Sequence, residues 1–335
     1  MTAHAPQLTT HMAAEIAQAP AVFAKAVAQQ LRLPDLGDLR AIYTVARGSS
    51  DAAANILSYE IMRELGLPMT SLPPSVFSLG QGVRLQEAAV LVISQSGASE
   101  DLLRSAQGAK AAGARVLALV NATDSAVEQA AEATLRIHAG PELAVPATKS
   151  VVGAIGGGMA LLGQLRPDYA PRAAASAAAI QALASVSLPQ TSAVLAALLR
   201  ARHVYVIGRD TGFGAAQELA LKLKECCALH AEAYSSSEVL HGPMQLVTNP
   251  LLILILDTEA PDVQDSLDTA EARFRAAGGT VFRLRPSDAG AQGLTPAAAA
   301  AALLCLTYPL ALNLALALGL NPDQPSTLSK VTQTR

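Results

Sequence analysis

The sequence is poor in aromatic residues: its 335 residues include five Phe, six Tyr and no Trp. Proteins that bind single-stranded nucleic acid stack its bases on aromatic side chains, so this class is disfavoured. Basic residues do not predominate either, because the chain has 24 Lys and Arg but 27 Asp and Glu, which gives a formal net charge of −3. Without aromatic platforms or a basic surface, we expect no nucleic-acid partner.

Cysteine is also scarce. Its three positions, Cys226, Cys227 and Cys305, make neither a disulfide framework nor a set of metal ligands. We interpret them as reduced thiols in a cytoplasmic protein. The N-terminal segment lacks a basic start followed by an apolar block, so it does not resemble a secretory signal.

One long uncharged run, residues 294–320, is apolar enough to cross a membrane by length alone. Pro309 and Asn313 interrupt it, and no cluster of Lys or Arg flanks it. We therefore expect a buried helix rich in Ala and Leu, and no membrane partner.

The chain is 51% hydrophobic, which is enough for the cores of two domains, and it contains an internal repeat. Residues 41–54 align with residues 203–216, and at the same offset residues 89–96 align with residues 251–258. Each segment contains a continuous apolar run that leads into a polar or Gly-containing turn. Apolar strands that alternate with helices predict a parallel sheet covered on both faces. The sequence thus predicts an α/β fold with two similar domains.

The spacing of apolar residues predicts a helix over residues 10–31, with a break or kink at Pro20. Residues 166–190 mix Pro with Ala-rich helical sequence and predict a boundary helix and a linker. Strands are expected near residues 41–46, 89–93, 115–120, 134–138, 203–207, 251–256 and 280–284.

Serine-rich turns follow two of these strands, at residues 47–51 and 94–99. In a parallel sheet, ligands bind beyond the carboxyl ends of the strands, where helix N–H groups and Ser hydroxyls suit a phosphate monoester. The alternative is that these serines only cap their helices, which is common. Two such turns in one domain favour phosphate. Neither is a P-loop, because GxxxxGK[ST] is absent, and GxGxxG is missing after the first strand.

A second polar constellation spans residues 221–243. Glu225 lies on an expected helix near Lys222, and His230 and His241 follow in what we interpret as a less regular polar loop. A carboxylate and an imidazole beside a phosphate site can act as a base and as a ring-opening group. In isolation, however, the Glu225–Lys222 spacing is better explained as a surface helix pair. The histidines lack HExxH spacing, so we expect no metal, and no other cofactor.

Five motifs connect the chain to a known family: RGSS (47–50), SQSG (94–97), GPELAVPATKS (140–150), LKLKE…HAEAY…E…HGP (221–243) and DQPSTLSKVT (323–332). Over essentially its whole length the chain resembles the SIS (sugar isomerase) domain family. Within that family it is similar to the isomerase region of glutamine–fructose-6-phosphate aminotransferases and to stand-alone glucosamine-6-phosphate deaminases. The resemblance implies two tandem flavodoxin-like, three-layer domains, a phosphorylated amino sugar as substrate and a homodimer with a shared active site.

The resemblance also implies how the chain is divided. We expect an N-terminal helical segment at residues 1–33, a first SIS domain at 34–170, a helical linker at 171–190, a second SIS domain at 191–322 and a tail over the active site at 323–335.

Carried over residue by residue, the resemblance implies three catalytic residues. Glu225 resembles the base that moves a proton between C1 and C2 of the open-chain sugar. His241 resembles the ring-opening histidine, which reaches in from the neighbouring subunit. Lys330 resembles the C-terminal lysine that can form a Schiff base with an open-chain ketose. The implied phosphate- and sugar-binding residues are Ser49, Ser50, Ser94, Gln95, Ser96, Ser99, Val145 and Lys222.

The sequence departs from the aminotransferase pattern at Ala147, where the pattern has Ser, and at Ala98, where it often has Glu. No Cys precedes Cys226, whereas glutamine hydrolysis needs an N-terminal Cys nucleophile, so we expect no use of glutamine as the source of ammonia. The resemblance then implies conversion of glucosamine 6-phosphate to fructose 6-phosphate and ammonia. The alternatives are a galactosamine-6-phosphate deaminase, a fructosamine-phosphate deglycase, a phosphosugar isomerase and a non-enzymatic phosphosugar sensor.

Overall fold

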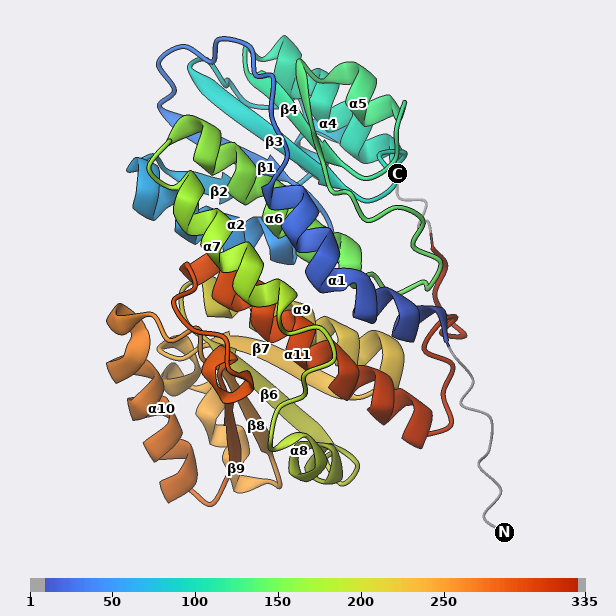
Figure 1. The fold of residues 1–335 in the computed structure, drawn as a ribbon, viewed down its shortest axis with the longest axis vertical. Coiled ribbons are helices and arrows are strands. Elements are labelled where there is room, and N and C mark those ends of the chain that lie inside the picture. The colour runs from blue at the N-terminus through green and yellow to red at the C-terminus, as the bar shows by residue number, and fades with distance from the viewer. Residues whose placement is uncertain (1–9, 331–335) are drawn as a thin grey trace.

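The computed structural model describes residues 10–330, which form two parallel sheets with helices packed against them (Figure 1). The strands are β1 (Ala41–Val45), β2 (Met69–Ser71), β3 (Ala88–Ser94), β4 (Arg115–Val120), β5 (Ala133–Arg136), β6 (His203–Gly208), β7 (His230–Ser235), β8 (Leu252–Leu256) and β9 (Thr280–Leu284). The α-helices are α1 (His11–Val27), α2 (Ser49–Leu65), α3 (Ser75–Ser78), α4 (Glu100–Ala111), α5 (Ala126–Ala130), α6 (Lys149–Leu165), α7 (Ala170–Gln181), α8 (Thr191–Leu198), α9 (Thr211–Cys227), α10 (Gln264–Ala276) and α11 (Pro296–Ala317). Four short 3-10 helices are η1 (Glu238–His241), η2 (Pro243–Thr248), η3 (Pro261–Val263) and η4 (Pro286–Ala289).

The two sheets share one topology. The first has the strand order β2-β1-β3-β4-β5, and the second has the order β7-β6-β8-β9. All of these strand pairings are parallel. In both sheets the first strand of the domain lies between the second and the third, which is the flavodoxin-like order. The prediction of two tandem α/β domains is confirmed.

The seven expected strands are all present, but the sequence analysis missed two edge strands. The segment His230–Ser235, interpreted as a polar loop, is strand β7 and pairs only with β6. An edge strand pairs with one neighbouring strand, and its other edge is open to solvent. Its sequence can therefore include polar residues and needs no continuous apolar run. The other missed strand, β2, is only three residues long and pairs with β1 at the edge of the first sheet.

Helix α1 is shorter than expected and is not broken by proline. It ends at Val27, where the periodicity predicted residue 31, and it continues as one helix through Pro20. A proline inside a helix costs about 3 kcal/mol because it removes a backbone hydrogen bond. Here Pro20 is buried, and α1 packs closely against α6 and α7. Tertiary packing therefore outweighs the local preference to break the helix.

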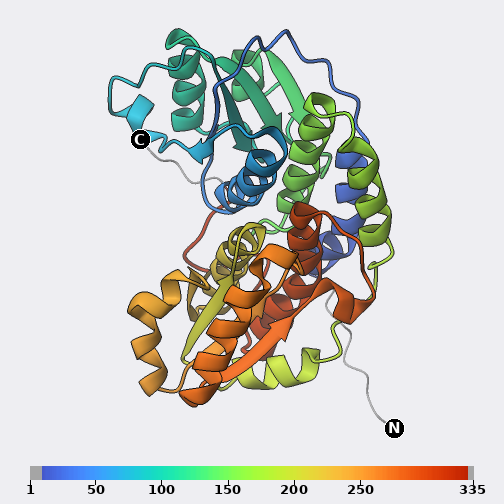
Figure 2. The ribbon, with the colours of Figure 1, turned by 90° about the vertical axis from the view of Figure 1, so that its left-hand side faces the viewer.

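The largest hydrophobic core belongs to both domains at once. It combines the inner faces of the two sheets with buried side chains of α1, α2, α6, α7, α9 and α11. These helices lie between the two sheets, as Figure 1 and the side view in Figure 2 show. Smaller cores lie on the outer faces, under α4 and α5 in the first domain and under α10 in the second. The predicted boundaries at 33/34, 170/171, 190/191 and 322/323 stay a prediction, and residues 1–9 and 331–335 lie outside the described residues.

Helix α11 contains the apolar run that raised the question of a membrane. It is long and apolar enough to span one, but its most hydrophobic 18-residue window is 83% buried inside the protein. The helix packs against α9, α6 and α2 in the shared core. This environment is that of a core helix, as the interruptions at Pro309 and Asn313 led us to expect.

The contact between α2 and α9 depends on the absence of a side chain at Gly214. A Cβ atom built there would lie 2.6 Å from Ile56 Cγ1 and 2.9 Å from the Ala52 carbonyl oxygen. We expect Gly214→Ala to lower the free energy of unfolding by about 2 kcal/mol, because overpacking outweighs the better helix propensity of Ala. Urea denaturation measures this change. Lys224→Ala, on an exposed position of the same helix, is the control and should change stability by about 0.5 kcal/mol or less. An unaltered midpoint for Gly214→Ala would contradict the close contact.

Candidate active site

The two serine-rich turns lie side by side at the carboxyl edge of the first sheet. Strands β1 and β3 are neighbours, so the turns that follow them meet at the same edge. An ion pair connects the turns, because Arg47 in the first binds the buried Asp101 in the first turn of α4. Gly48 permits the tight entry into α2 with φ +52°.

Most hydroxyls in these turns do not cap the following helices. Gly48 is the N-cap of α2, and Ser99, the N-cap of α4, makes no capping hydrogen bond through its side chain. Ser94 Oγ is buried and accepts a hydrogen bond from the Gly97 N–H at 2.9 Å, which shapes the second turn. No side chain caps α2 or α4 from the N-cap position, although Asp101 accepts from the Leu102 N–H in the first turn of α4. Helix starts without an N-cap side chain suit a phosphate. Ser50, Gln95 and Ser96 are half-buried around the same edge.

Lys222 lies at the centre of a buried polar cluster where the two domains meet. Its side chain has no exposed surface, and its Nζ forms an ion pair with Glu225 and lies 3.6 Å from Glu218 Oε1. Glu218 also accepts a hydrogen bond from Tyr308 of α11, at 3.2 Å, and Ser49 of the first serine turn lies near enough to lower the pKa of its carboxyl. The interpretation of Lys222 and Glu225 as a surface helix pair is wrong, because packing of α2 and α11 against α9 covers the lysine.

Burial controls the protonation of this cluster. Burial raises the pKa of the Glu218 carboxyl to about 7, although the nearby Lys222 ammonium acts in the opposite direction. Burial by itself would lower the pKa of Lys222, but the Glu218 and Glu225 carboxylates outweigh it and raise that pKa. The lysine therefore stays charged and holds Glu225, whose side chain is 24% exposed.

The C-terminal segment folds back onto the loop that precedes α6. Lys330 Nζ donates a hydrogen bond to the Ala144 carbonyl oxygen at 2.5 Å and lies 3.4 Å from Glu142 Oε2. Glu142 is buried and also accepts from the backbone N–H groups of Thr148 and Ser150, at 3.1 and 3.0 Å. One carboxylate thus connects the tail lysine with the start of α6.

Helix α1 fixes the same loop and tail. Asp323 accepts hydrogen bonds from the first two N–H groups of α1, both at 2.8 Å, and its carbonyl oxygen accepts from the Val145 N–H. Glu15 of α1 is buried and binds the backbone N–H groups of Leu143 and Ala144. In Figure 1 the red segment after α11 accordingly runs past the start of α1 toward the first domain. The backbone around Val145 is therefore held from two sides.

The structure does not bring His241 to the other site residues within one chain. His241 is exposed in η1, after the edge strand β7. No hydrogen bond or ion pair of the described residues joins it to Glu225. His230 lies at the start of β7, where its ring contacts His203. In residues 10–330 no group of three or more His, Cys, Asp and Glu side chains is placed to hold a metal ion.

Three residues of the candidate site were not predicted from the sequence. Glu218 lies one helical turn before Lys222, so the i,i+4 spacing was available as a signal. Glu142 stands inside a motif that was recognised, but nothing in the motif assigned it a role. Tyr308 is 90 residues from Glu218 and no local pattern connects the two. Its pKa is raised well above the ordinary value by burial and by the nearby Glu218 carboxylate.

The fold and this edge define a class: tandem parallel α/β domains with a hydroxyl-rich site where the domains meet. A sequence profile of the SIS domain matches residues 36–161 and 197–283. The chain belongs to the SIS domain family. This confirms the resemblance that the five motifs indicated.

Individual relatives agree with this assignment. The chain is similar to two glutamine–fructose-6-phosphate aminotransferases (isomerizing). The protein from Zymomonas mobilis is 29% identical over 94% of this chain and 56% of its own length. The protein from Aeropyrum pernix is 32% identical over 85% of this chain and 50% of its own length. The chain therefore spans about half the length of these curated relatives.

A solved structure covers more of the chain. A protein from Silicibacter pomeroyi DSS-3, designated a phosphosugar isomerase, superposes with a TM-score of 0.82 at 30% identity. The match covers 94% of this chain and the whole of that one. The arrangement of both domains is thus found in a related protein.

The raised pKa of Glu218 predicts a pH-dependent stability. Between its ordinary value of 4.5 and about 7, the unfolded chain releases this proton while the folded chain keeps it. Stability from this group is therefore full at low pH and falls as pH rises, by up to about 1.4 kcal/mol per pH unit. We expect Glu218→Gln to remove this slope in urea denaturation series between about pH 5 and pH 7. Glu238→Gln, at an exposed glutamate, should retain it. Equal slopes for the Glu218→Gln variant and the wild type would disprove the assignment.

Proposed function

We propose that the chain binds a phosphorylated amino sugar and converts glucosamine 6-phosphate to fructose 6-phosphate and ammonia. The observation that carries the proposal is the buried Lys222 cluster, in which Lys222 joins Glu225 to Glu218 and Glu218 lies near Ser49 of a serine turn. A phosphate anchor in one domain and a carboxylate base in the other are thereby held in one rigid unit. Membership of the SIS domain family supports the same substrate class.

The proposed reaction transfers a proton from C2 to C1 and breaks one C–N bond. The serine turns hold the phosphate, and His241 of a second subunit opens the sugar ring by proton transfer. Glu225 then removes the proton from C2 of the open-chain aldehyde and returns it at C1, while the C1 oxygen takes up a proton and the C2 nitrogen releases one. The C2–nitrogen double bond that results is hydrolysed: water adds at C2, the nitrogen leaves as ammonia, and the ketone of fructose 6-phosphate remains. No electron acceptor is needed.

Lys222 and Lys330 have different proposed roles. Lys222 is fully buried between two carboxylates, so it orients Glu225 without meeting the sugar. Lys330 closes the site from the tail, where its ammonium is bound to the Ala144 carbonyl oxygen next to Val145. In this proposal the lysine and the Val145 backbone contact the sugar that the serine turns hold.

A simple phosphosugar isomerase is the second candidate. The similar Silicibacter pomeroyi protein is designated as one, and proton transfer between C1 and C2 is also the central step of aldose–ketose isomerisation. A galactosamine-6-phosphate deaminase and a fructosamine-phosphate deglycase would use the same groups. A non-enzymatic phosphosugar sensor would need the serine turns but not Glu225.

The direct test is to incubate the purified chain with glucosamine 6-phosphate and to measure ammonia and fructose 6-phosphate together. Equal amounts of both products support the deaminase. Galactosamine 6-phosphate is assayed alongside for the epimer. If neither sugar releases ammonia, the deaminase is wrong. Interconversion of aldose and ketose phosphates would then identify the isomerase, and binding without turnover the sensor.

Replacing the proposed base should stop the chemistry but not the binding. We expect Glu225→Gln to lower the rate of ammonia release by about 100-fold or more, because a positioned general base contributes at least that factor. Affinity for the sugar phosphate, measured by calorimetry, should change little. Glu232→Gln, on the neighbouring strand β7, is the matched control and should retain activity. Undiminished turnover by the Glu225→Gln variant would exclude the assigned role.

The exposed position of His241 predicts a site shared between subunits. Glu225→Gln and His241→Ala chains, each inactive alone, should regain activity when mixed, because a heterodimer contains one intact site. Random mixing of a symmetric dimer should restore about a quarter of the wild-type activity. Verified heterodimers that remain inactive would place His241 outside a shared site.

A further inference from the structure

The second domain repeats the two serine-rich turns of the first domain. The backbone conformation is the same at corresponding positions, but acidic residues replace the glycines. In the repeat alignment Gly48 corresponds to Asp210, and the two residues have nearly equal angles: φ 52°, ψ −127° and φ 57°, ψ −132°. Gly97, with φ 60°, corresponds in the same way to Glu259, with φ 61°. Left-handed backbone at φ near +60° favours glycine, so two carboxylate residues in this conformation carry strain.

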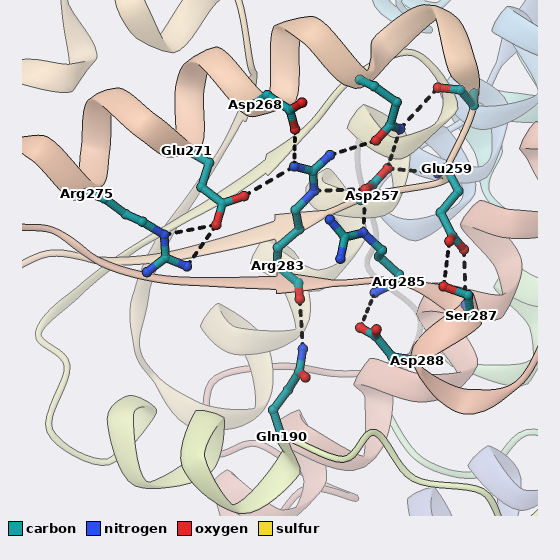
Figure 3. Close-up of polar contacts among 12 residues, drawn as sticks. Gln190, Asp257, Glu259, Asp268, Glu271, Arg275, Arg283, Arg285, Ser287 and Asp288 are labelled. Atoms are coloured by element: carbon teal, nitrogen blue, oxygen red, sulfur yellow. Dashed lines mark hydrogen bonds and ion pairs between the residues drawn. The ribbon is translucent and has the colours of Figure 1, made fainter.

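Asp257 occupies the position that corresponds to Gln95, so a carboxylate of the protein itself lies in this turn. Asp257 is fully buried and accepts hydrogen bonds from Arg283 Nε at 2.8 Å, from Arg285 Nε at 3.0 Å and from the Glu259 N–H at 2.8 Å (Figure 3). Gln264 donates to the same carboxylate. The donors that could hold a phosphate are thereby occupied, and a second anion would meet Asp257.

A cavity of about 580 Å³ adjoins this altered turn. Its wall includes Thr258, Glu259 and Asp262 after β8, Ser287 of η4, and Arg63 near the end of α2. Arg63 is already neutralised by an ion pair with Asp210. The two remaining charged groups of the wall are the carboxylates of Glu259 and Asp262, so the cavity favours a cation.

Thr258 points separately to a ligand. Its side chain is only 5% exposed, and its Oγ1 atom is buried without a hydrogen-bond partner among the described residues. An unpaired buried hydroxyl costs about 1–3 kcal/mol, so such groups generally have a partner. A ligand in the cavity that Thr258 lines can supply that partner. Glu259 follows Thr258 in the chain, and hydrogen bonds from the Ser287 N–H and hydroxyl hold its carboxylate in place (Figure 3).

The cavity is separate from the proposed active site. Ser49 and Arg63 lie at opposite ends of α2, and 14 residues at 1.5 Å each place them roughly 21 Å apart along the helix. A ligand of monosaccharide size fits the cavity volume and cannot reach the serine turns from there.

We propose that this cavity is a second binding site, for a small polyhydroxylated ligand that carries a positively charged ammonium group and no phosphate. The carboxylates of Glu259 and Asp262 receive the ammonium group, and Thr258 and Ser287 meet the hydroxyls. Asp257 occupies the Arg283 and Arg285 donors that could otherwise hold a phosphate, so a phosphorylated ligand gains no anion site here.

Calorimetry with glucosamine as the probe tests the proposal, at a pH below neutrality where its amine is protonated. Glucosamine should bind, and glucose, which has the same hydroxyls without the charge, should bind at least about tenfold more weakly. Glu259→Gln should weaken glucosamine binding. Asp262→Asn changes an exposed position, leaves the turn intact and should weaken glucosamine binding as well. Ser96→Ala, in the phosphate turn of the first domain, should not change it. Thermal unfolding shows whether each variant is folded.

Three results would overturn the site. One is the absence of glucosamine binding at millimolar concentration, and another is equal affinity for glucose. The third is binding that Ser96→Ala abolishes and Asp262→Asn preserves, which would place the sugar in the proposed active site. Because the readout is binding of an unphosphorylated amine, these results are independent of whether the chain deaminates glucosamine 6-phosphate.

Discussion

The ammonium group of Lys222 has no contact with water and is balanced by the carboxylates of Glu218 and Glu225 on the same helix. A charge buried in this way is tolerated only when its partners are also fixed, because removal of one partner leaves an uncompensated charge. Glu218 is fixed from outside α9: Tyr308 of α11 donates a hydrogen bond to it, and Ser49 of α2 lies near it. The helices of the shared core must therefore assemble around this lysine together. The same constraint sets the position of Glu225 relative to the serine turns.

The two domains have the same strand order but different charges at the corresponding turns. Both have the same strand order, and both have left-handed backbone at the corresponding turn positions. In the first domain these positions are glycines, which leave amides and hydroxyls for an anion. In the second they are Asp210 and Glu259, and the neighbouring Asp257 is neutralised by Arg283 and Arg285. The backbone conformation is thus retained while the side chains at these positions differ in charge.

Much of the fold could be predicted because it depends on local pattern. Continuous apolar runs such as residues 89–93 and 251–256 specify buried parallel strands, and the repeat specifies two copies of one domain. Strand β7 could not be predicted, since its alternating polar residues are stable only beside β6. The helix through Pro20 was predicted, but its continuity there could not be, because proline lowers helix stability locally and packing against α6 and α7 offsets this. Local rules failed where an edge or a neighbouring helix supplied the missing stabilisation.

The candidate site, like the fold, could be predicted from the sequence only in part. The sequence by itself determined which chemical groups are available: hydroxyls and glycines after two strands, a Lys–Glu pair on a helix and a lysine near the C-terminus. It also determined, through its motifs, the SIS domain family. Only the tertiary structure decided that the Lys–Glu pair is buried, that Glu218 and Tyr308 complete it, and that the tail returns to the loop at Ala144. Charge, burial and proton affinity depend on residues that are far apart in the chain. For that reason the i,i+4 spacing of Glu218 and Lys222 could suggest a pair, but no spacing could reveal its burial or its contact with Tyr308.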